Sequence, residues 1–320
     1  MATATATTAT KTLSGVLTAE PGDARLRRLE SDAARVFAGA RRVGVAFSGG
    51  VDSTVLLAVA ARALGPSHVV AVTGVSASLA ARELTGAREL AASLGVELVE
   101  IATGEMDRPA YRRNGLDRCF HCKDTLFQTV DDTLLTRYRL DAVAYGETAD
   151  DVARGDRPGS AAAARHGVLR PLADAGFRKA DVRGLAAALG LPNALKPAAP
   201  CLASRIPHGS EVTADKLRQV ETAEAALHDL GFTAVRVRHH GTVARVEVPE
   251  SRFADLMACR DEVLEAVRAA GFPLVCLDLT GLRSGGLYQI AASPGAAPAG
   301  IPSGDHTLAG PAARGTGKKE

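Results

Sequence analysis

Large aromatic side chains and a dominant charge are what this sequence lacks most. Tryptophan is absent from its 320 residues, aromatic residues make up 4% of them, and the formal net charge is +2. Any hydrophobic core must therefore consist mainly of Ala, Leu and Val. A net charge near zero argues against nucleic-acid binding, which relies on a strongly basic surface. No apolar run reaches membrane-spanning length and no signal-peptide pattern is found, so we expect a cytoplasmic protein without membrane partners.

Cysteine is also scarce, and its odd count of five does not fit a set of disulfides. In a reducing compartment this pattern favours metal or redox chemistry. Cys119 and Cys122 form a C-x-x-C motif, and Cys201 stands in a separate segment. Three thiolates can bind three irons of a [4Fe–4S] cluster and leave the fourth iron open, whereas a fourth ligand such as His121 or His208 would complete a zinc site. The motif alone also fits a redox dithiol.

The most distinctive stretch leads from apolar residues 43–47 through the loop SGGVDS into a helix-forming run. A strand, a glycine turn and a helix start in this order direct backbone N–H groups and the positive helix end at one spot, which is a phosphate site. The loop matches neither the Walker A motif nor the dinucleotide fingerprint. It resembles the loop of the PP-loop ATP pyrophosphatases, which cleave ATP to AMP and pyrophosphate. This resemblance implies that ATP and Mg²⁺ are bound by Ser48, Gly49, Gly50, Asp52 and Ser53.

Apolar stretches alternate with helical patterns over the first two thirds of the chain. This alternation predicts an α/β fold, a doubly wound parallel sheet with helices on both faces, over residues 23–205. The polar loop 146–151 follows the last of these strands, where ligands of such sheets bind. Its Asp150 and Asp151 are candidates to position Mg²⁺ or nucleotide, or to cap the next helix. The expected strands are 43–47, 68–75, 96–101 and 142–146, and the expected helices are 24–40, 53–64 and 79–94.

From about residue 206 the pattern becomes that of a second, smaller α+β domain, which extends to residue 290. Two segments alternate apolar with charged residues, which is the period of a strand with one wet face. Cys259 and Cys276 have apolar neighbours and are predicted to be small buried hydrophobes. The terminal segments 1–22 and 291–320 are predicted to be disordered. The expected elements are helices 213–230 and 251–270 and strands 234–238, 243–248 and 274–279.

Seven motifs in one order carry a more specific resemblance. They are SGGVDS, RCFHCK, GETADDVARGDRPG, LRPLADAGFRKADVRGLAAALGLP, KPAAPCLASRIPHG, VRVRHHG and LDLTGLRSGG. Many families share the first motif, whereas the segment CLASRIPHG and the paired arginines of VRVRHHG are narrower signals. Over roughly residues 24–289 the chain resembles the LarE-type ATP-dependent sulfur transferases.

The resemblance implies an activity. These enzymes adenylate a carboxylate of a pyridinium dicarboxylate mononucleotide and replace it by thiocarboxylate, in the synthesis of the nickel-pincer cofactor of lactate racemase. Cys201 matches the active-site cysteine of the family. In one branch that cysteine gives up its own sulfur. In the other branch the cysteine joins a C-x-x-C to hold a [4Fe–4S] cluster. The cluster carries the sulfur to be transferred and receives it from a sulfide source. The C-x-x-C of this chain implies the cluster-bearing branch, and the resemblance also implies a homo-oligomer.

The resemblance further implies roles for charged residues of the second domain. Glu224 and Asp255 match catalytic groups around the cysteine, and Arg236 and Arg238 match groups that bind the substrate phosphate. Residues two apart on a strand share a face, so these two arginines can act together. Further candidates for anion binding are Arg154, Arg157 and Arg205, of which Arg205 is assigned to the substrate phosphate.

Other functions use parts of the same pattern. A tRNA thiolase with a PP-loop also uses three cysteines, but it should carry a basic RNA-binding surface, which a net charge of +2 does not favour. An amide-forming synthetase of the same superfamily would not need the three cysteines. A nucleotide-binding scaffold stapled by zinc is the alternative that is not an enzyme. The sacrificial-cysteine version of the transferase is the remaining alternative.

Overall fold

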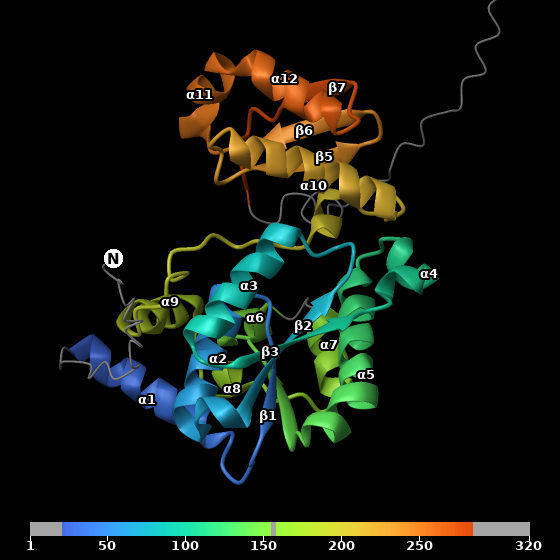
Figure 1. Cartoon of the computed structure of the whole chain (residues 1–320). Coiled ribbons are helices and arrows are strands. Elements are labelled where there is room, and N and C mark those ends of the chain that lie inside the picture. The colour runs from blue at the N-terminus through green and yellow to red at the C-terminus, as the bar shows by residue number, and fades with distance from the viewer. Residues whose placement is uncertain (1–20, 155–157, 284–320) are drawn as a thin grey trace, which may run out of the picture.

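The computed structural model describes residues 21–154 and 158–283, which form two β-sheets with helices around them (Figure 1). The larger sheet has four strands in the order β3-β2-β1-β4. All of its pairings are parallel, which confirms the predicted α/β fold. The order reverses beside β1, so the carboxyl ends of β1 and β4 flank a topological switch point. The strands are β1 (Val43–Ala46), β2 (Val69–Val75), β3 (Glu97–Ala102) and β4 (Ala142–Tyr145).

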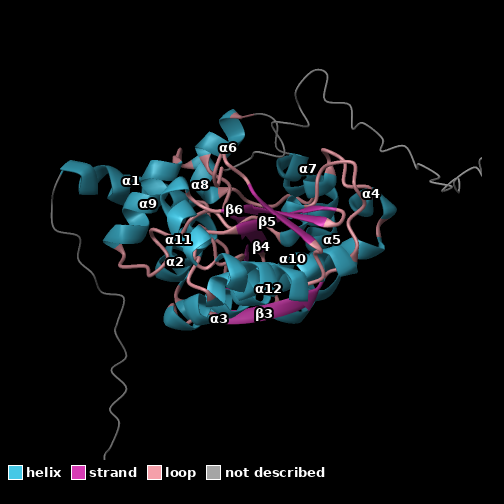
Figure 2. Ribbon diagram, turned by 90° about the horizontal axis from the view of Figure 1, so that it is seen from above, coloured by secondary structure: helices cyan, strands magenta, loops and turns pink. Residues whose placement is uncertain are grey.

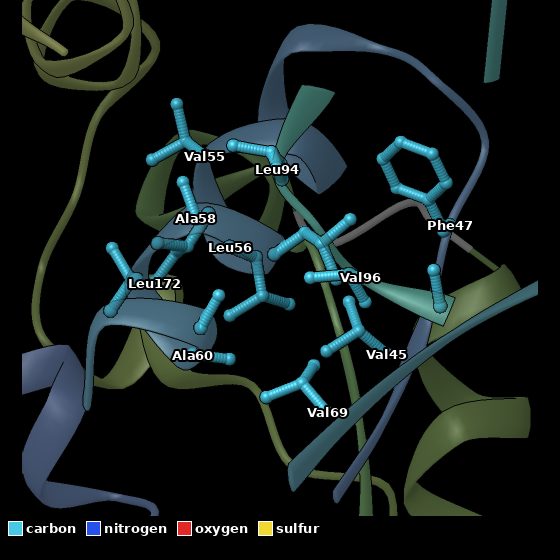
Figure 3. Close-up of a cluster of buried hydrophobic side chains, with 14 of the residues drawn as sticks. Val45, Phe47, Val55, Leu56, Ala58, Ala60, Val69, Leu94, Val96 and Leu172 are labelled. Carbon is cyan, nitrogen blue, oxygen red and sulfur yellow. The ribbon is translucent and has the colours of Figure 1, made fainter. Parts of the chain in front are cut away.

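Helices cover both faces of this sheet because its strands are apolar on both sides. Along β2, Val69 and Ala71 point into one core, whereas Val70 and Val72 point into another. Figure 3 shows the first core, where Val45 and Val69 of the sheet meet apolar side chains of α2. Its helices are α1 (Pro21–Arg35), α2 (Val51–Leu64), α3 (Ala81–Ser93), α8 (Pro171–Asp174) and α9 (Lys179–Ala188), and the opposite face packs on α5 (Arg118–Tyr138) and α7 (Pro158–Arg165).

The smaller sheet has three strands in the order β5-β6-β7, with β5 and β6 antiparallel and β6 and β7 parallel. Viewed from above, its strands lie over the larger sheet (Figure 2). The expected helix 251–270 is wrong as one element, because the chain leaves helical geometry at Cys259 and two helices form. The elements are β5 (Arg236–His240), β6 (Val243–Glu247), β7 (Leu274–Leu277), α10 (Ala214–Asp229), α11 (Phe253–Ala258) and α12 (Arg260–Ala269).

Short elements link the two sheets. The helix α4 (Pro109–Arg112) lies between β3 and α5, and its Tyr111 is buried in the core under the smaller sheet. Leu202 and Ala203 join the same core. The second core is therefore filled partly by residues that precede residue 206. The other short elements are α6 (Ala149–Ala153) and the 3₁₀ turns η1 (Pro66–His68), η2 (Glu105–Asp107), η3 (Leu202–Arg205) and η4 (Glu250–Arg252).

Two predicted features need separate comment. Cys276 is exposed and Cys259 is partly exposed, so the prediction that both are buried is wrong. The reason is that β7 is an edge strand, and Cys276 lies on its open side with Leu274.

Within the described ranges, every helix is too short or too polar to cross a membrane. The expected disordered tail 291–320 and residues 1–20 of the expected disordered segment 1–22 lie outside the described residues, whereas α1 already begins at Pro21.

Candidate active site

The loop after β1 has the geometry of an anion site. Gly49 has a φ of +67°, and a Cβ there would lie 3.2 Å from the backbone of Ala87, so a side chain would be both strained and crowded. Gly50 is the N-cap of α2 and offers no side-chain acceptor to the first N–H groups of the helix. Those groups and the helix dipole therefore remain available to an anion.

The end of β4 closes against this loop. A Cβ at Gly146 would lie 2.9 Å from the backbone nitrogen of Ser53, so only glycine permits such a close approach. The two loops at the topological switch point therefore lie against each other, beside the residues predicted to bind ATP. The structure brings together the predicted ATP residues Ser48, Gly49, Gly50, Asp52 and Ser53.

A lysine that the sequence patterns did not single out occupies the same place. Lys179 Nζ lies 2.5 Å from Asp52 Oδ2 and 2.8 Å from Asp151 Oδ2. Asp52 Oδ1 is enclosed and has no hydrogen-bond partner among the described residues, so it is a suitable oxygen ligand for Mg²⁺. Asp151 also caps α6 by accepting a bond from the Thr148 backbone, so the capping alternative holds for it as well.

A second missed residue fixes the loop. Asn193 is buried and its amide donates to the Gly49 carbonyl (3.2 Å) and to Thr54 Oγ1 (2.9 Å). The chain then runs from Asn193 toward Cys201. At Leu202 the chain is bonded to the loop after β2, because the Leu202 N–H donates to the Ser78 carbonyl at 2.9 Å. One segment therefore connects the phosphate loop to the cysteines.

The three predicted cysteines share one environment. Cys119 and Cys122 lie in the first turn of α5, and Cys201 is the N-cap of η3. Burial raises the pKa of the Cys122 thiol well above its ordinary value, and Cys201, Glu105 and Cys119 raise it further, whereas Arg118 lowers it. All five cysteines of the chain are free thiols. Cys122 also packs against the core that contains Leu202, the residue after Cys201, so the segments of the three cysteines meet there.

Two buried residues that sequence analysis missed face these thiols. Glu105 accepts hydrogen bonds from Ser76 and, at 3.1 Å, from Ser78. Burial raises the pKa of the Tyr111 phenol, and Cys201 and Cys122 raise it further. No motif quoted above contains either residue, so only their approach in the fold reveals them.

The zinc alternative finds no ligand set in the described part of the chain, where no three His, Cys, Asp or Glu side chains are arranged to hold one metal ion. His121 instead contacts Asp117 (3.0 Å), and His208 contacts the Asn114 carbonyl (3.2 Å). Thiols that surround a polynuclear cluster bind different irons, so they stand further apart than ligands of one ion. The same finding lends no support to a [4Fe–4S] cluster, which stays a prediction.

The predicted phosphate-binding arginines differ in how they are paired. Arg205 makes two bonds of 2.9 Å to Glu224, and Arg238 makes two bonds of 2.9 Å to Glu247. Arg236 is also buried, but it donates to the carbonyls of Arg283 (2.8 Å) and Ala198 (3.3 Å). Among the described residues it forms no ion pair with a carboxylate. Burial lowers the pKa of Arg236, and the neighbouring arginines lower it further.

The predicted acidic residues are placed unequally. Glu224 is buried beside the cysteine segment, where it pairs with Arg205 and accepts a bond from the Val237 N–H (2.8 Å). Asp255 is exposed on α11 and pairs with Arg252 (2.6 Å). The structure therefore brings Glu224, but not Asp255, into contact with the arginines of the site. Of the further candidates, Arg154 is exposed and Arg157 lies outside the described residues.

Comparison with known proteins decides the family. The asparagine synthase family profile matches residues 26–141, which contain the phosphate loop. A pyridinium-3,5-bisthiocarboxylic acid mononucleotide synthase of Lactiplantibacillus plantarum is 37% identical over 245 residues, covering 77% of this chain and 88% of that protein. The chain belongs to the LarE family. Membership in the LarE family makes it an enzyme with a PP-loop domain, for which ATP with Mg²⁺ is the implied ligand.

Two uncharacterized relatives extend this LarE-family match. A protein of Synechocystis sp. is 39% identical over 251 residues, covering 78% of this chain and 92% of that protein. A protein of Methanocaldococcus jannaschii is 28% identical over 172 residues, covering 54% of this chain and 66% of that protein. The first match spans almost the whole length of that relative.

Proposed function

We propose that this enzyme uses ATP to adenylate a carboxylate of a pyridinium dicarboxylate mononucleotide and then replaces that carboxylate by thiocarboxylate. The name of the Lactiplantibacillus relative, a pyridinium-3,5-bisthiocarboxylic acid mononucleotide synthase, supports this product. Membership in the LarE family places the step in the synthesis of a nickel-pincer nucleotide. The observation that carries the proposal is the segment 193–205. It contacts the phosphate loop through Asn193, contains Cys201, and ends at Arg205 in the arginine group.

Adenylation is assigned to the phosphate loop. A carboxylate oxygen of the substrate attacks the α-phosphorus of ATP, the bond to the β-phosphate oxygen breaks, and pyrophosphate leaves. The N-terminus of α2 and the Lys179 ammonium are placed to stabilise the charge that develops on pyrophosphate. Asp52 would hold Mg²⁺, which when bound would supply further positive charge against the pyrophosphate. The acyl adenylate gives the poor electrophile a good leaving group.

Sulfur transfer is assigned to the cysteines. A sulfur nucleophile attacks the acyl carbon, the bond to AMP breaks, and a thiocarboxylate remains. Cys119, Cys122 and Cys201 would hold a [4Fe–4S] cluster, since they are free thiols around one site. When bound, the cluster would supply sulfide at an iron without a protein ligand. The partners are then the mononucleotide and a sulfide source, and a homo-oligomer stays a prediction.

Arg236 is the best candidate for the substrate phosphate. Its charge is buried and its donors meet carbonyls, so a phosphate would supply the anion that the described residues do not. Arg205 and Arg238 are already paired bidentately with glutamates. We assign them to the positive surroundings of the site, with Glu224 as the group that orients Arg205 beside Cys201.

The test is anaerobic purification followed by iron and acid-labile sulfide analysis, with a Cys122→Ser control. About four irons and four sulfides per chain, lost in the control, would support sulfur delivery by a cluster. ATP-dependent AMP formation without iron would point to the second candidate, in which Cys201 gives up its own sulfur. Exposure of Cys201 favours that candidate as well. Intact mass after one turnover separates the two, because only the sacrificial route lowers the protein mass by one H₂S.

A further inference from the structure

Asn114 bonds two segments that lie far apart in the sequence. It is fully buried, and its φ of +58° is a left-handed conformation that asparagine tolerates better than most residues. Its amide nitrogen donates to the carbonyls of Ile206 (3.2 Å), Pro207 (2.8 Å) and Ser210 (3.0 Å). Its own carbonyl accepts the Gly209 N–H at 3.1 Å. The chain just before the C-x-x-C is thereby bonded to the chain just after Cys201.

Arg118 extends this contact toward the thiols. It is buried, and its Nη1 donates to Asn114 Oδ1 (2.5 Å) and to the Ala203 carbonyl (2.8 Å). Arg118 directly precedes Cys119, and Ala203 lies two residues after Cys201. The Arg118 guanidinium therefore links the helix that carries Cys119 to the Ala203 carbonyl, in the segment of Cys201. It also contacts Asn114, which bonds that same segment.

We propose that Asn114 and Arg118 form a clamp that sets the position of Cys201 relative to Cys119 and Cys122. Both are positioning residues, and the inference rests on the proposed function in that the three thiols act together. The cysteine segments belong to different elements and have no disulfide between them, so non-covalent contacts hold their spacing, and Asn114 and Arg118 supply directional ones. Loss of the Asn114 amide leaves three carbonyls without their donor, which favours separation of the segments.

The test measures the thiols themselves rather than turnover. In a Cys259→Ser, Cys276→Ser background, the disulfide between Cys201 and the C-x-x-C is equilibrated with a glutathione buffer. Its equilibrium constant gives the effective concentration of Cys201 at that motif. Asn114→Gly keeps the left-handed backbone and removes the side chain with both its amide donor and its Oδ1 acceptor. We expect its effective concentration to be at least tenfold below that of the parent protein.

A matched control separates positioning from general loss of stability. Asn193→Ala removes another buried asparagine, which bonds the phosphate loop instead of the cysteine segment. We expect it to weaken ATP binding and to leave the effective concentration of Cys201 unchanged within twofold. Asn114→Asp is isosteric but aims a carboxylate at three carbonyls, so it should resemble Asn114→Gly.

The result that overturns the clamp is an equal effective concentration, within twofold, in the parent and in Asn114→Gly, including the case in which neither forms the disulfide. If Asn114→Gly does not fold by circular dichroism, Arg118→Lys replaces it, because the lysine nitrogen stops one bond short of Arg118 Nη1, the single nitrogen that serves both acceptors. At least a fivefold loss is then expected. The iron content of the protein tests the cluster separately from this disulfide equilibrium. A protein without iron would reject the cluster, and the disulfide equilibrium would still test the clamp.

Discussion

At the scale of single residues, two arginines on the same face of β5 provide a sharp contrast. Arg238 is paired with the buried Glu247, whereas Arg236 meets only carbonyls among the described residues. Arg238→Met removes two bonds of 2.9 Å from the buried Glu247 and leaves it only the bond from Arg245 (3.2 Å), so it should reduce the free energy of unfolding by about 2 kcal/mol. Arg236→Met strands no charge, so we expect a loss of about 1 kcal/mol. Urea unfolding of both variants measures the difference.

The same pair separates folding from substrate binding. If Arg236 holds the substrate phosphate, Arg236→Met should raise the KM for the mononucleotide at least tenfold while its KM for ATP stays the same. Arg236→Lys should restore only part of this, since an ammonium does not make the bidentate contact of a guanidinium. An unchanged KM for the mononucleotide in the folded Arg236→Met protein would remove Arg236 from the phosphate site.

A second prediction concerns Lys179 at the phosphate loop. Its ammonium lies between two carboxylates and is placed to stabilise pyrophosphate as it leaves. Loss of one such preorganised group in an active site costs about 10² to 10³ in rate. Lys179→Met should therefore slow ATP-dependent pyrophosphate release about 100-fold, as measured by a coupled phosphate assay. Lys216→Met on α10, which removes a lysine from the second domain, is the control that should keep the rate.

At the scale of elements, a polar network joins α5 to α7. Asp124 of α5 contacts Arg108 (2.7 Å), Arg165 (3.4 Å) and His166 (3.1 Å). Burial opposes ionisation of Asp124, but the bonds from Arg108 and His166, together with the charge of Arg165, hold its pKa below its ordinary value. A lowered pKa means that the ionised carboxylate stabilises the fold above the pKa of the unfolded chain.

This contribution should disappear as the pH falls through the lowered pKa of Asp124, that is, below about pH 4. In Asp124→Asn the acid dependence of the free energy of unfolding should be shallower by one proton, and the variant should be less stable than the parent at pH 7. Urea unfolding between pH 3 and pH 7 measures both effects. Parallel curves for parent and variant would show that Asp124 is not a source of the acid sensitivity.

Most elements could be predicted from local patterns, and the exceptions have local reasons. The strands of the larger sheet were found within one or two residues, because buried parallel strands read as continuous apolar runs. The helix expected over 251–270 was divided in the structure, since Cys259 adopts a φ of −108° and a ψ of 35° that its side chain does not signal. The exposure of Cys276 follows from its place at a sheet edge, which depends on strand order rather than on neighbours in sequence.

At the scale of the whole molecule, the sequence identified residues with chemistry of their own but missed those that matter by position. Cys119, Cys122, Cys201 and Gly49 stand in motifs with a recognisable spacing. Asn114 and Tyr111 do not, because their roles depend on partners about 90 residues away in the chain, as the 92-residue separation of Asn114 and Ile206 shows. Pairing of Arg205 with Glu224 is likewise a long-range contact, which periodicity cannot reveal.

The boundary predicted at residues 205 and 206 has a consequence for folding that can be tested. The core under the smaller sheet contains Tyr111, Leu202 and Ala203, all of which precede that boundary. A fragment of residues 206–283 would leave those places empty and expose the apolar faces of α10 and β5. Cavities of this size cost several kcal/mol, which is comparable to the whole stability of a small domain. We therefore expect the fragment to lack a cooperative thermal transition by circular dichroism, whereas the full chain has one.

Tyr111→Ala in the full chain should lower the free energy of unfolding by about 3 kcal/mol or more, and Tyr111→Phe, which keeps the ring, by less. A fragment that unfolds cooperatively would show that residues 206–283 complete their own core, and the role assigned to Tyr111 in joining the two sheets would then be wrong.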